Sequence, residues 1–171
     1  YPDVRCEALR EAISGFEQVN MEEILCGNGA AELFFAAVQA VRPQKALVTA
    51  PSFSEYEEAL RSVGAEVEYY YLCEEDNFQI REDYVDKLSE EIDMIFLCNP
   101  NNPTGQIIDR DMLIKILDRC KKQNIIVILD ECFLEFLDEP NSYEMSDLRE
   151  EYPHLLIIKA FTKIFSMPGL R

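Results

Sequence analysis

Two lysines stand four residues apart near the end of the sequence, in the stretch IIKAFTKIFSMPGLR (157–171). A lysine amine can attack a carbonyl carbon and hold a carbonyl-containing ligand covalently. Lys159 and Lys163 are therefore both candidates for covalent chemistry. Residue type alone does not choose between them.

Two further segments carry polar residues directly after apolar runs. Asp130 ends the run IIVILDE (125–131), where a buried carboxylate needs either a protein cation or a ligand cation as its partner. The string NPNNPTG (99–105) contains two prolines and a glycine, which exclude regular structure. Its asparagine side chains can offer amide donors from a rigid loop.

The segment GNGAAE (27–32) places two glycines immediately before a helix-forming run. Backbone N–H groups at a helix N-terminus attract anions, so this segment is a candidate phosphate site. A glycine turn that merely enters a helix explains it equally well. A dinucleotide-binding fingerprint is disfavoured, because Glu32 stands where the third glycine belongs.

Short apolar runs alternate with helix-periodic segments, which predicts parallel strands joined by helical crossovers. The carboxyl ends of such strands form a ligand crevice, so the polar residues above are expected to converge there. The expected strands are 46–50, 65–72, 93–98, 125–131 and 154–161; the expected helices are 30–41, 54–64, 82–91, a segment from 109 or 111 to 123, and a short one near 145–151.

Composition disfavours several classes of protein. The net charge of −17 argues against nucleic-acid binding, and the apolar runs are too short for a membrane helix. Six cysteines are scattered without a CxxC pair and His154 is the single histidine, so no metal site is predicted. Reduced, mostly buried thiols in a cytoplasmic protein are expected. The chain begins at Tyr1 without a methionine and is interpreted as a piece of a longer protein.

NPNNPTG, the DE pair after IIVIL, and TKIFSMPGLR, in this order and spacing, resemble the fold-type-I pyridoxal-phosphate (PLP) enzymes. YPD, GNGAAEL and APSFSEY extend the resemblance to the class I/II aminotransferases, in the branch of histidinol-phosphate aminotransferase and threonine-phosphate decarboxylase. It implies a three-layer α/β sandwich with a mostly parallel central sheet. Residues 1–171 would be an incomplete PLP-binding large domain, without the N-terminal arm and the C-terminal small domain.

The resemblance assigns roles around the cofactor ring. Lys163, eight residues before Arg171, matches the lysine that holds PLP as a Schiff base and moves the Cα proton. Asp130 would pair with the pyridine nitrogen, Asn102 would hydrogen-bond the phenolic oxygen, and Phe53 would stack on the ring. Lys159 is then interpreted as a structural or loop-facing charge.

The resemblance also implies a set of phosphate contacts. In this branch the tyrosine of the YPD segment reaches the phosphate of the neighbouring subunit, which predicts a homodimer. The expected phosphate contacts are the backbone amides of Asn28, Gly29 and Ala30, the guanidinium of Arg171, the hydroxyl of Thr162, and Tyr1 from the partner subunit.

Two positions depart from the aminotransferase pattern. Phe133 stands where these enzymes usually have a tyrosine, which favours the decarboxylase type. Ala160 replaces a frequent hydroxyl residue, for which Thr162 is expected to compensate.

The resemblance predicts a PLP-dependent enzyme acting on a small, phosphorylated amino compound. Transamination and decarboxylation both stay open, because the arginine that binds the substrate carboxylate normally lies in the C-terminal part. The alternatives are a PLP-fold sensor domain of a transcription regulator, a catalytically inactive fragment, and an ordinary nucleotide-binding α/β domain. For residues 1–171 alone, weak PLP binding and little turnover are expected.

Overall fold

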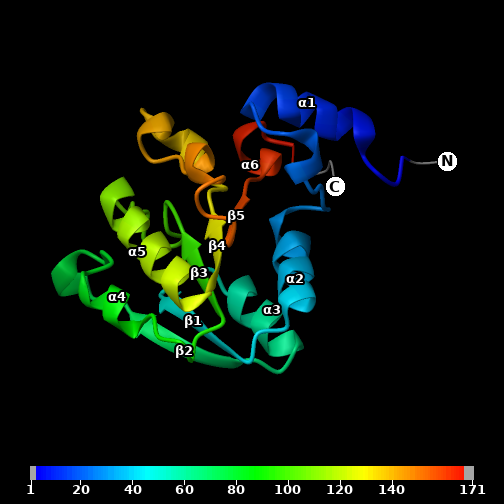
Figure 1. Cartoon of the computed structure of the whole chain (residues 1–171). Helices are drawn as coiled ribbons and strands as arrows, with labels where there is room; N and C mark the ends of the chain where they lie inside the picture. The colour runs from blue at the N-terminus through cyan, green and yellow to red at the C-terminus, as the bar shows by residue number, and fades with distance from the viewer. Residues whose placement is uncertain (1–2, 168–171) are drawn as a thin grey trace.

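The computed structural model describes residues 3–167 and is built on one five-stranded, fully parallel sheet (Figure 1). The strand order is β2-β1-β3-β4-β5. The expected α/β class with a parallel central sheet is therefore confirmed. The strands are β1 (Lys45–Ala50), β2 (Glu66–Tyr71), β3 (Met94–Cys98), β4 (Ile126–Asp130) and β5 (Leu155–Ile158).

Helices cover both faces of the sheet and make three layers (Figure 1). On one face, α2 (Ala30–Val41) and α3 (Glu55–Ser62) pack against Val48, Phe96 and other inward-facing strand residues. On the other face, α4 (Asp83–Lys87) and α5 (Arg110–Gln123) pack against the alternate strand residues. Because both faces are buried, β3 has no exposed residue, as expected for a central parallel strand.

The chain reverses its direction of winding between β1 and β3. From β1 the chain passes through α3 to β2 on one side, and β3, β4 and β5 follow on the other side. A ligand crevice is expected beyond the carboxyl ends of the strands at such a switch point. In the register of the sheet Cys98 lies opposite Asp130, and Asp130 opposite Ile158, so these three strands end side by side.

The last strand ends earlier in the structure than the sequence predicts. The sequence predicts a strand over 154–161, whereas β5 stops at Ile158 and a short helix, α6 (Phe161–Ile164), follows. The backbone N–H of Glu131 donates to the carbonyl of Ile158, which is where β4 itself has just ended. Beyond this point β4 offers no further partner, and the chain leaves the sheet.

Two predicted helices are shorter in the structure. The helix expected over 82–91 is limited to α4, because Leu88 and Ile92 turn inward to the core and Arg119 Nε donates to the carbonyl of Leu88 at 2.8 Å. The segment near 145–151 forms only a 3₁₀ turn over Ser146–Leu148.

Besides α6, the first helix of the chain was not predicted from the sequence. Helix α1 (Glu7–Glu17) has no fully buried residue and lies beside α6 in Figure 1. Ion pairs tie this region to the rest of the molecule: Lys159 Nζ lies 2.5 Å from a carboxylate oxygen of Glu17, and Arg149 Nε lies 3.1 Å from one of Glu23.

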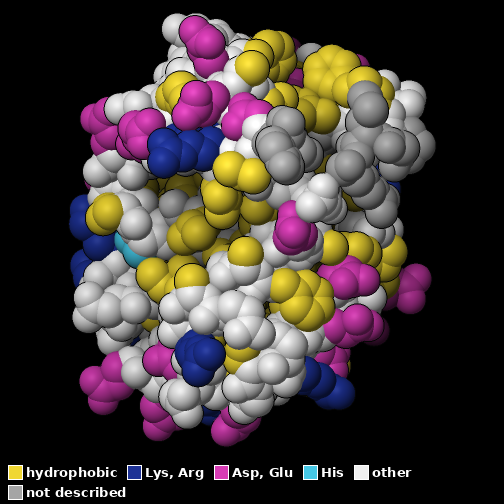
Figure 2. Space-filling model, turned by 90° about the vertical axis from the view of Figure 1, so that its right-hand side faces the viewer, with side chains coloured by type: hydrophobic (Ala, Val, Ile, Leu, Met, Phe, Trp, Pro, Cys, Tyr) yellow, Lys and Arg dark blue, Asp and Glu magenta, His cyan; other side chains and the backbone are white. Residues whose placement is uncertain are grey.

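The surface mixes acidic and apolar side chains. Figure 2 shows hydrophobic and acidic side chains interspersed over one face of the molecule. Exposed apolar side chains among the described residues include Leu9 and Phe16 of α1, Leu25, and Phe165. Within residues 3–167, no helix combines the length and the low charge needed to cross a membrane.

All six cysteines are free. Three of them are buried and three are partly exposed, whereas most of them were expected from the sequence to be buried. Burial raises the pKa of the Cys98 and Cys120 thiols to about 12, which keeps them protonated. In the described part of the chain, no group of three or more His, Cys, Asp or Glu side chains is arranged to hold a metal ion.

Candidate active site

Hydrogen bonds join the two loops that follow β1 and β3. The side-chain amide of Asn101 donates to the carbonyl of Pro51 at 3.1 Å and to Thr104 Oγ1 at 2.8 Å, and its oxygen accepts from Ser52 Oγ at 3.2 Å. Both loops start at the switch point of the sheet. Asn101 therefore holds Pro51 and Ser52, the two residues before Phe53, which was predicted to stack on a ring.

The asparagines of NPNNPTG divide into buried and accessible ones. Asn99 is fully buried, and its side-chain oxygen accepts from the Ile108 amide at 2.8 Å. The backbone N–H of Asn99 donates to the carbonyl of Asp130, which couples the loop to the end of β4. Asn102 is partly exposed, and its side chain makes no hydrogen bond to any residue that the structure describes. The contact between Asn102 and a ligand stays a prediction.

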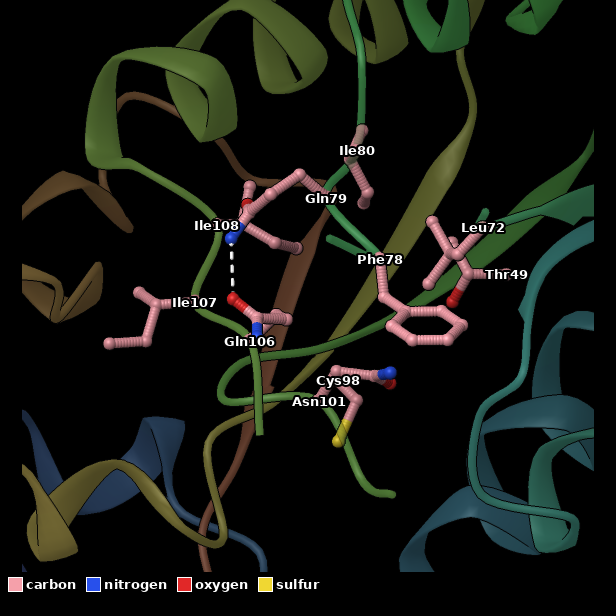
Figure 3. A pocket seen from close by; sticks show the side chains of 10 residues that line it. All are labelled: Thr49, Leu72, Phe78, Gln79, Ile80, Cys98, Asn101, Gln106, Ile107 and Ile108. Atoms are coloured by element: carbon pink, nitrogen blue, oxygen red, sulfur yellow. Dashed lines mark hydrogen bonds between the residues drawn. The ribbon is translucent and has the colours of Figure 1, made fainter. Parts of the chain in front are cut away.

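A small cavity lies against the NPNNPTG loop (Figure 3). This loop and the residues that follow it form part of its wall, and the segment that follows β2 forms another part. A hydrogen bond of 2.7 Å from Gln79 Nε2 to Gln106 Oε1 joins the loop to the segment that follows β2. The cavity measures about 10 Å³, roughly the room for one water molecule. It is too small for a cofactor, and its packing supports the loop from below.

Asp130 is buried at the carboxyl end of β4, with 5% of its surface exposed. Its Oδ2 accepts a hydrogen bond of 2.6 Å from the Tyr56 hydroxyl, and its Oδ1 accepts one of 2.9 Å from the backbone N–H of Cys132. Neither donor carries a positive charge. These donors therefore leave the negative charge of Asp130 without a positive partner, and a cationic group of a ligand can be that partner.

Tyr56 reaches Asp130 from α3. Burial, followed by the negative charge of Asp130, raises the pKa of the Tyr56 hydroxyl far above its ordinary value of 10.0. The hydroxyl stays neutral at any physiological pH and acts as a donor to the carboxylate. The same causes, burial first, raise the pKa of the Cys132 thiol, whereas the positive charge of Lys163 lowers it.

Lys163 lies in α6, five residues beyond the end of β5, and its side chain is exposed. Its Nζ lies 5.7 Å from the centre of the Phe133 ring, within the range of a cation–π contact. Phe133 lies three residues after Asp130, the last residue of β4. Because Lys163 contacts Phe133, it lies near the same carboxyl end of the sheet as Asp130. Thr162 and Ala160 are partly buried beside it.

Lys159 has a different environment from Lys163. Its Nζ lies 2.5 Å from Glu17 and 2.6 Å from Glu144, in a half-buried position. These bonds raise its pKa to about 12, although burial alone would lower it. Lys159 is therefore an ion-pairing residue, as its interpretation as a structural charge predicts.

Glu131 is a buried carboxyl group next to this ion pair. It is 2% exposed, its Oε1 accepts from the Met145 amide at 3.3 Å, and its Oε2 has no partner among the described residues. Burial raises its pKa from 4.5 to about 8, the charges of Glu144 and Glu17 add to the shift, and Lys159 opposes it. Glu131 therefore keeps its proton at neutral pH in the folded protein.

Replacement of Glu131 by glutamine is expected to remove a pH dependence of stability. In the unfolded chain this carboxyl loses its proton near pH 4.5, but in the folded protein only near pH 8. The folded state therefore binds more protons in this window, and the wild type loses stability relative to Glu131→Gln as pH rises through it. Unfolding in urea from pH 4 to 9 measures the difference between the two proteins. A difference that stays constant, or one that changes in the opposite direction, would contradict the assignment.

The amides before α2 are partly used within the chain. The N–H of Asn28 donates to Glu32 Oε2 at 2.5 Å, and the N–H of Gly29 donates to the carbonyl of Gly27. Glu32 thus occupies the amide of Asn28, the residue before the N-cap Gly29, at the place where a phosphate was predicted. An anion that binds the Asn28 amide must displace Glu32. Gly29 has a positive φ of 86°, and no described atom lies within 4 Å of the place where a Cβ would stand.

Some predicted residues lie outside the described part of the chain. Tyr1 and Arg171, the expected phosphate contacts at the two ends, belong to the segments 1–2 and 168–171. Of the other predicted residues, Asn102 follows β3, Asp130 is the last residue of β4, and Lys163 follows β5. Phe53 follows β1 and packs edge-on against Phe34 with 6.5 Å between ring centres.

Sequence reasoning did not find Tyr56 or Glu32. The hydroxyl of Tyr56 bonds a residue 74 positions away, and the pattern of α3 marks Tyr56 only as an inward-facing position. Glu32 gives no capping-box signal either, because that motif needs Ser or Thr at the N-cap, whereas the N-cap here is Gly29.

Comparison with known proteins decides the family. The family description "Aminotransferase class I and II" matches residues 1–171, the whole chain. The chain belongs to the class I and II aminotransferases. Members of this aminotransferase family are enzymes that depend on pyridoxal phosphate.

Two relatives of the chain are named for different activities. It is 37% identical over 171 residues to threonine-phosphate decarboxylase of Salmonella typhimurium and 33% identical over 175 residues to histidinol-phosphate aminotransferase of Ruminiclostridium cellulolyticum. Both alignments cover all of this chain, but 46% and 47% of the relatives. The chain spans about half the length of the curated relatives it matches.

Solved structures of aminotransferase-family proteins have the same fold. The histidinol-phosphate aminotransferase of Clostridium acetobutylicum matches all of this chain with a TM-score of 0.88 and 34% identity, over 50% of its own length. The L-threonine-O-3-phosphate decarboxylase of Porphyromonas gingivalis matches with a TM-score of 0.83 and 28% identity, over 51% of its length.

The side chains at the crevice of this aminotransferase-family chain suit the groups of the cofactor ring. Asp130 is a buried carboxylate with only neutral donors, which suits a protonated pyridine nitrogen. Lys163 is an exposed amine, and Asn102 has an unused side-chain amide. The fit at the phosphate is partial within the described residues, because Glu32 occupies the Asn28 amide.

Proposed function

We propose that the protein carrying this chain is a PLP-dependent enzyme that acts on a small, phosphorylated amino compound. The observation that supports it most is Asp130: a buried carboxylate oriented by two neutral donors at the strand edge that also carries Asn102 and the helix of Lys163. The relatives named as a threonine-phosphate decarboxylase and a histidinol-phosphate aminotransferase support the substrate class.

Each residue of the site has a proposed task in holding the cofactor. Lys163 would hold its aldehyde carbon, Asp130 its pyridine nitrogen, and Asn102 its phenolic oxygen, while Phe53 would cover a ring face. The proposed phosphate contacts are the amides of Asn28, Gly29 and Ala30, the side chains of Thr162 and Arg171, and Tyr1 of a second copy in a homodimer.

When bound, PLP supplies an electron-accepting ring that stabilises negative charge at the α-carbon of an amino substrate. The chain's own contribution is to hold a proton on the pyridine nitrogen through the charge of Asp130. The Lys163 amine gives or takes a proton at the α-carbon. Phe133 places an apolar ring beside that amine, with its centre 5.7 Å from Lys163 Nζ.

The reaction type is tested with the natural polypeptide that carries this chain. Threonine phosphate and histidinol phosphate are each offered with PLP and 2-oxoglutarate, and carbon dioxide and glutamate are measured. Carbon dioxide without glutamate identifies a decarboxylase, and glutamate identifies a transaminase. Because Phe133 replaces the tyrosine expected of aminotransferases, decarboxylation of threonine phosphate is the expected result. Absence of both products with PLP bound would contradict the proposed substrates.

A further inference from the structure

Tyr56 connects three parts of the fold that lie far apart in the sequence. Its ring stacks on Phe96 of β3, with ring centres 4.9 Å apart and an interplanar angle of 20°, and meets Phe34 of α2 edge-on at 5.0 Å. Its hydroxyl ends 2.6 Å from Oδ2 of Asp130. Tyr56 is fully buried, so packing on both sides holds the hydroxyl in one position.

The two hydrogen bonds to Asp130 together fix the plane of its carboxylate. The terminal torsion of an aspartate side chain is soft, so one donor alone leaves the carboxylate free to rotate. Here the Cys132 amide holds Oδ1 and the Tyr56 hydroxyl holds Oδ2. A carboxylate can accept about four hydrogen bonds, and these two donors use two of them.

We propose that Tyr56 is a positioning residue, which acts through Asp130 to orient its carboxylate toward the protonated ring nitrogen of the cofactor. This inference rests on the proposed function, because it requires PLP to lie against Asp130. Its physical basis is preorganisation: a carboxylate already held in place does not need to be ordered when the ligand binds. The neutral hydroxyl adds no positive charge, so the full negative charge of Asp130 stays available to the ligand.

The chain offers a matched control for the loss of a buried hydroxyl. Tyr84 is also fully buried, but it lies in the cluster on the opposite face of the sheet. Its hydroxyl has no partner among the described residues. Tyr56→Phe and Tyr84→Phe therefore remove the same atom from similar surroundings, and only the first removes a bond to Asp130.

The test measures dissociation constants of PLP from the natural polypeptide that carries this chain, by the absorbance change on binding. Tyr56→Phe is expected to weaken PLP binding about tenfold, the effect of one hydrogen bond to a charged group. Tyr84→Phe is expected to leave the constant within about twofold of wild type, since it breaks no hydrogen bond. Thermal melting without PLP shows whether both variants fold.

A second ligand separates positioning from a general structural role. In 1-deazapyridoxal phosphate a carbon atom replaces the ring nitrogen, so the contact to Asp130 is lost while the aldehyde and the phosphate remain. If Tyr56 acts through Asp130, Tyr56→Phe weakens PLP binding but leaves the binding of this analogue nearly unchanged. Equal weakening of both ligands overturns the inference, and so does an unchanged PLP constant.

The proposed function fails in a different way from this inference. If the wild-type protein does not bind PLP, the proposed function is overturned, and the role of Tyr56 with it. If the wild type binds PLP better than the deaza analogue but Tyr56→Phe behaves like Tyr84→Phe, only the positioning role is overturned. A selective loss of PLP affinity in Tyr56→Phe supports both.

Discussion

Replacement of Lys163 by arginine is expected to lower turnover by at least about a thousandfold, within the range by which positioned acids and bases accelerate reactions. Arginine keeps the positive charge beside the Phe133 ring, but its guanidinium neither attacks an aldehyde nor releases a proton at neutral pH. Because Lys163 is exposed, the substitution is expected to leave folding intact. Turnover of the preferred phosphorylated substrate, measured with saturating PLP, gives the effect.

Lys159→Arg is the matched control for this experiment. An arginine at position 159 can keep the ion pairs with Glu17 and Glu144, so turnover is expected to stay within a few-fold of wild type. If Lys159→Arg abolished turnover and Lys163→Arg did not, the assignment of the two lysines would be reversed. Wild-type activity in both variants would exclude both Lys159 and Lys163 as the catalytic amine.

Replacement of Asp130 by asparagine is expected to lower turnover by about 10²–10³-fold, the effect of removing one preorganised electrostatic contact. Asparagine has nearly the same shape and can still accept from Tyr56, so the chain is expected to fold. Alanine would add a second effect, since the buried Tyr56 hydroxyl would lose its acceptor at a cost of about 1–3 kcal/mol. The turnover number and the PLP dissociation constant are measured together.

Glu131→Gln is the control for the loss of a buried carboxyl group at the same strand end. Glu131 accepts from the Met145 amide and has no bond to Tyr56, so its substitution is expected to change turnover only a few-fold. If both substitutions reduced turnover equally, Asp130 would have no special relation to the cofactor. An effect on folding alone, without loss of PLP affinity, would also contradict its role.

The regular elements of the core were predictable because their signals are local. The apolar face of α5 and the run of β4 carry periodicities that burial on a sheet requires, and both elements lie within one residue of their predicted bounds. The end of β5 was not predictable in this way. It depends on where the neighbouring strand β4 stops, which the residues of 154–161 do not encode.

The candidate site was predictable in its residue types more than in its contacts. Asn102, Asp130 and Lys163 were identified by motifs, and their position at one edge follows from the parallel order of the strands. The bond from Tyr56 to Asp130 is a tertiary contact between residues with no shared local pattern. The use of the Asn28 amide by Glu32 likewise depends on a side-chain conformation, which the spacing permits but does not require.

The most direct test of the account is chemical. The natural polypeptide that carries this chain is incubated with PLP, reduced with borohydride and digested, and the modified peptide is identified by mass spectrometry. A reduced PLP adduct on Lys163 is the expected result. An adduct on Lys159 or on any other lysine, with Lys163 unmodified, would contradict it.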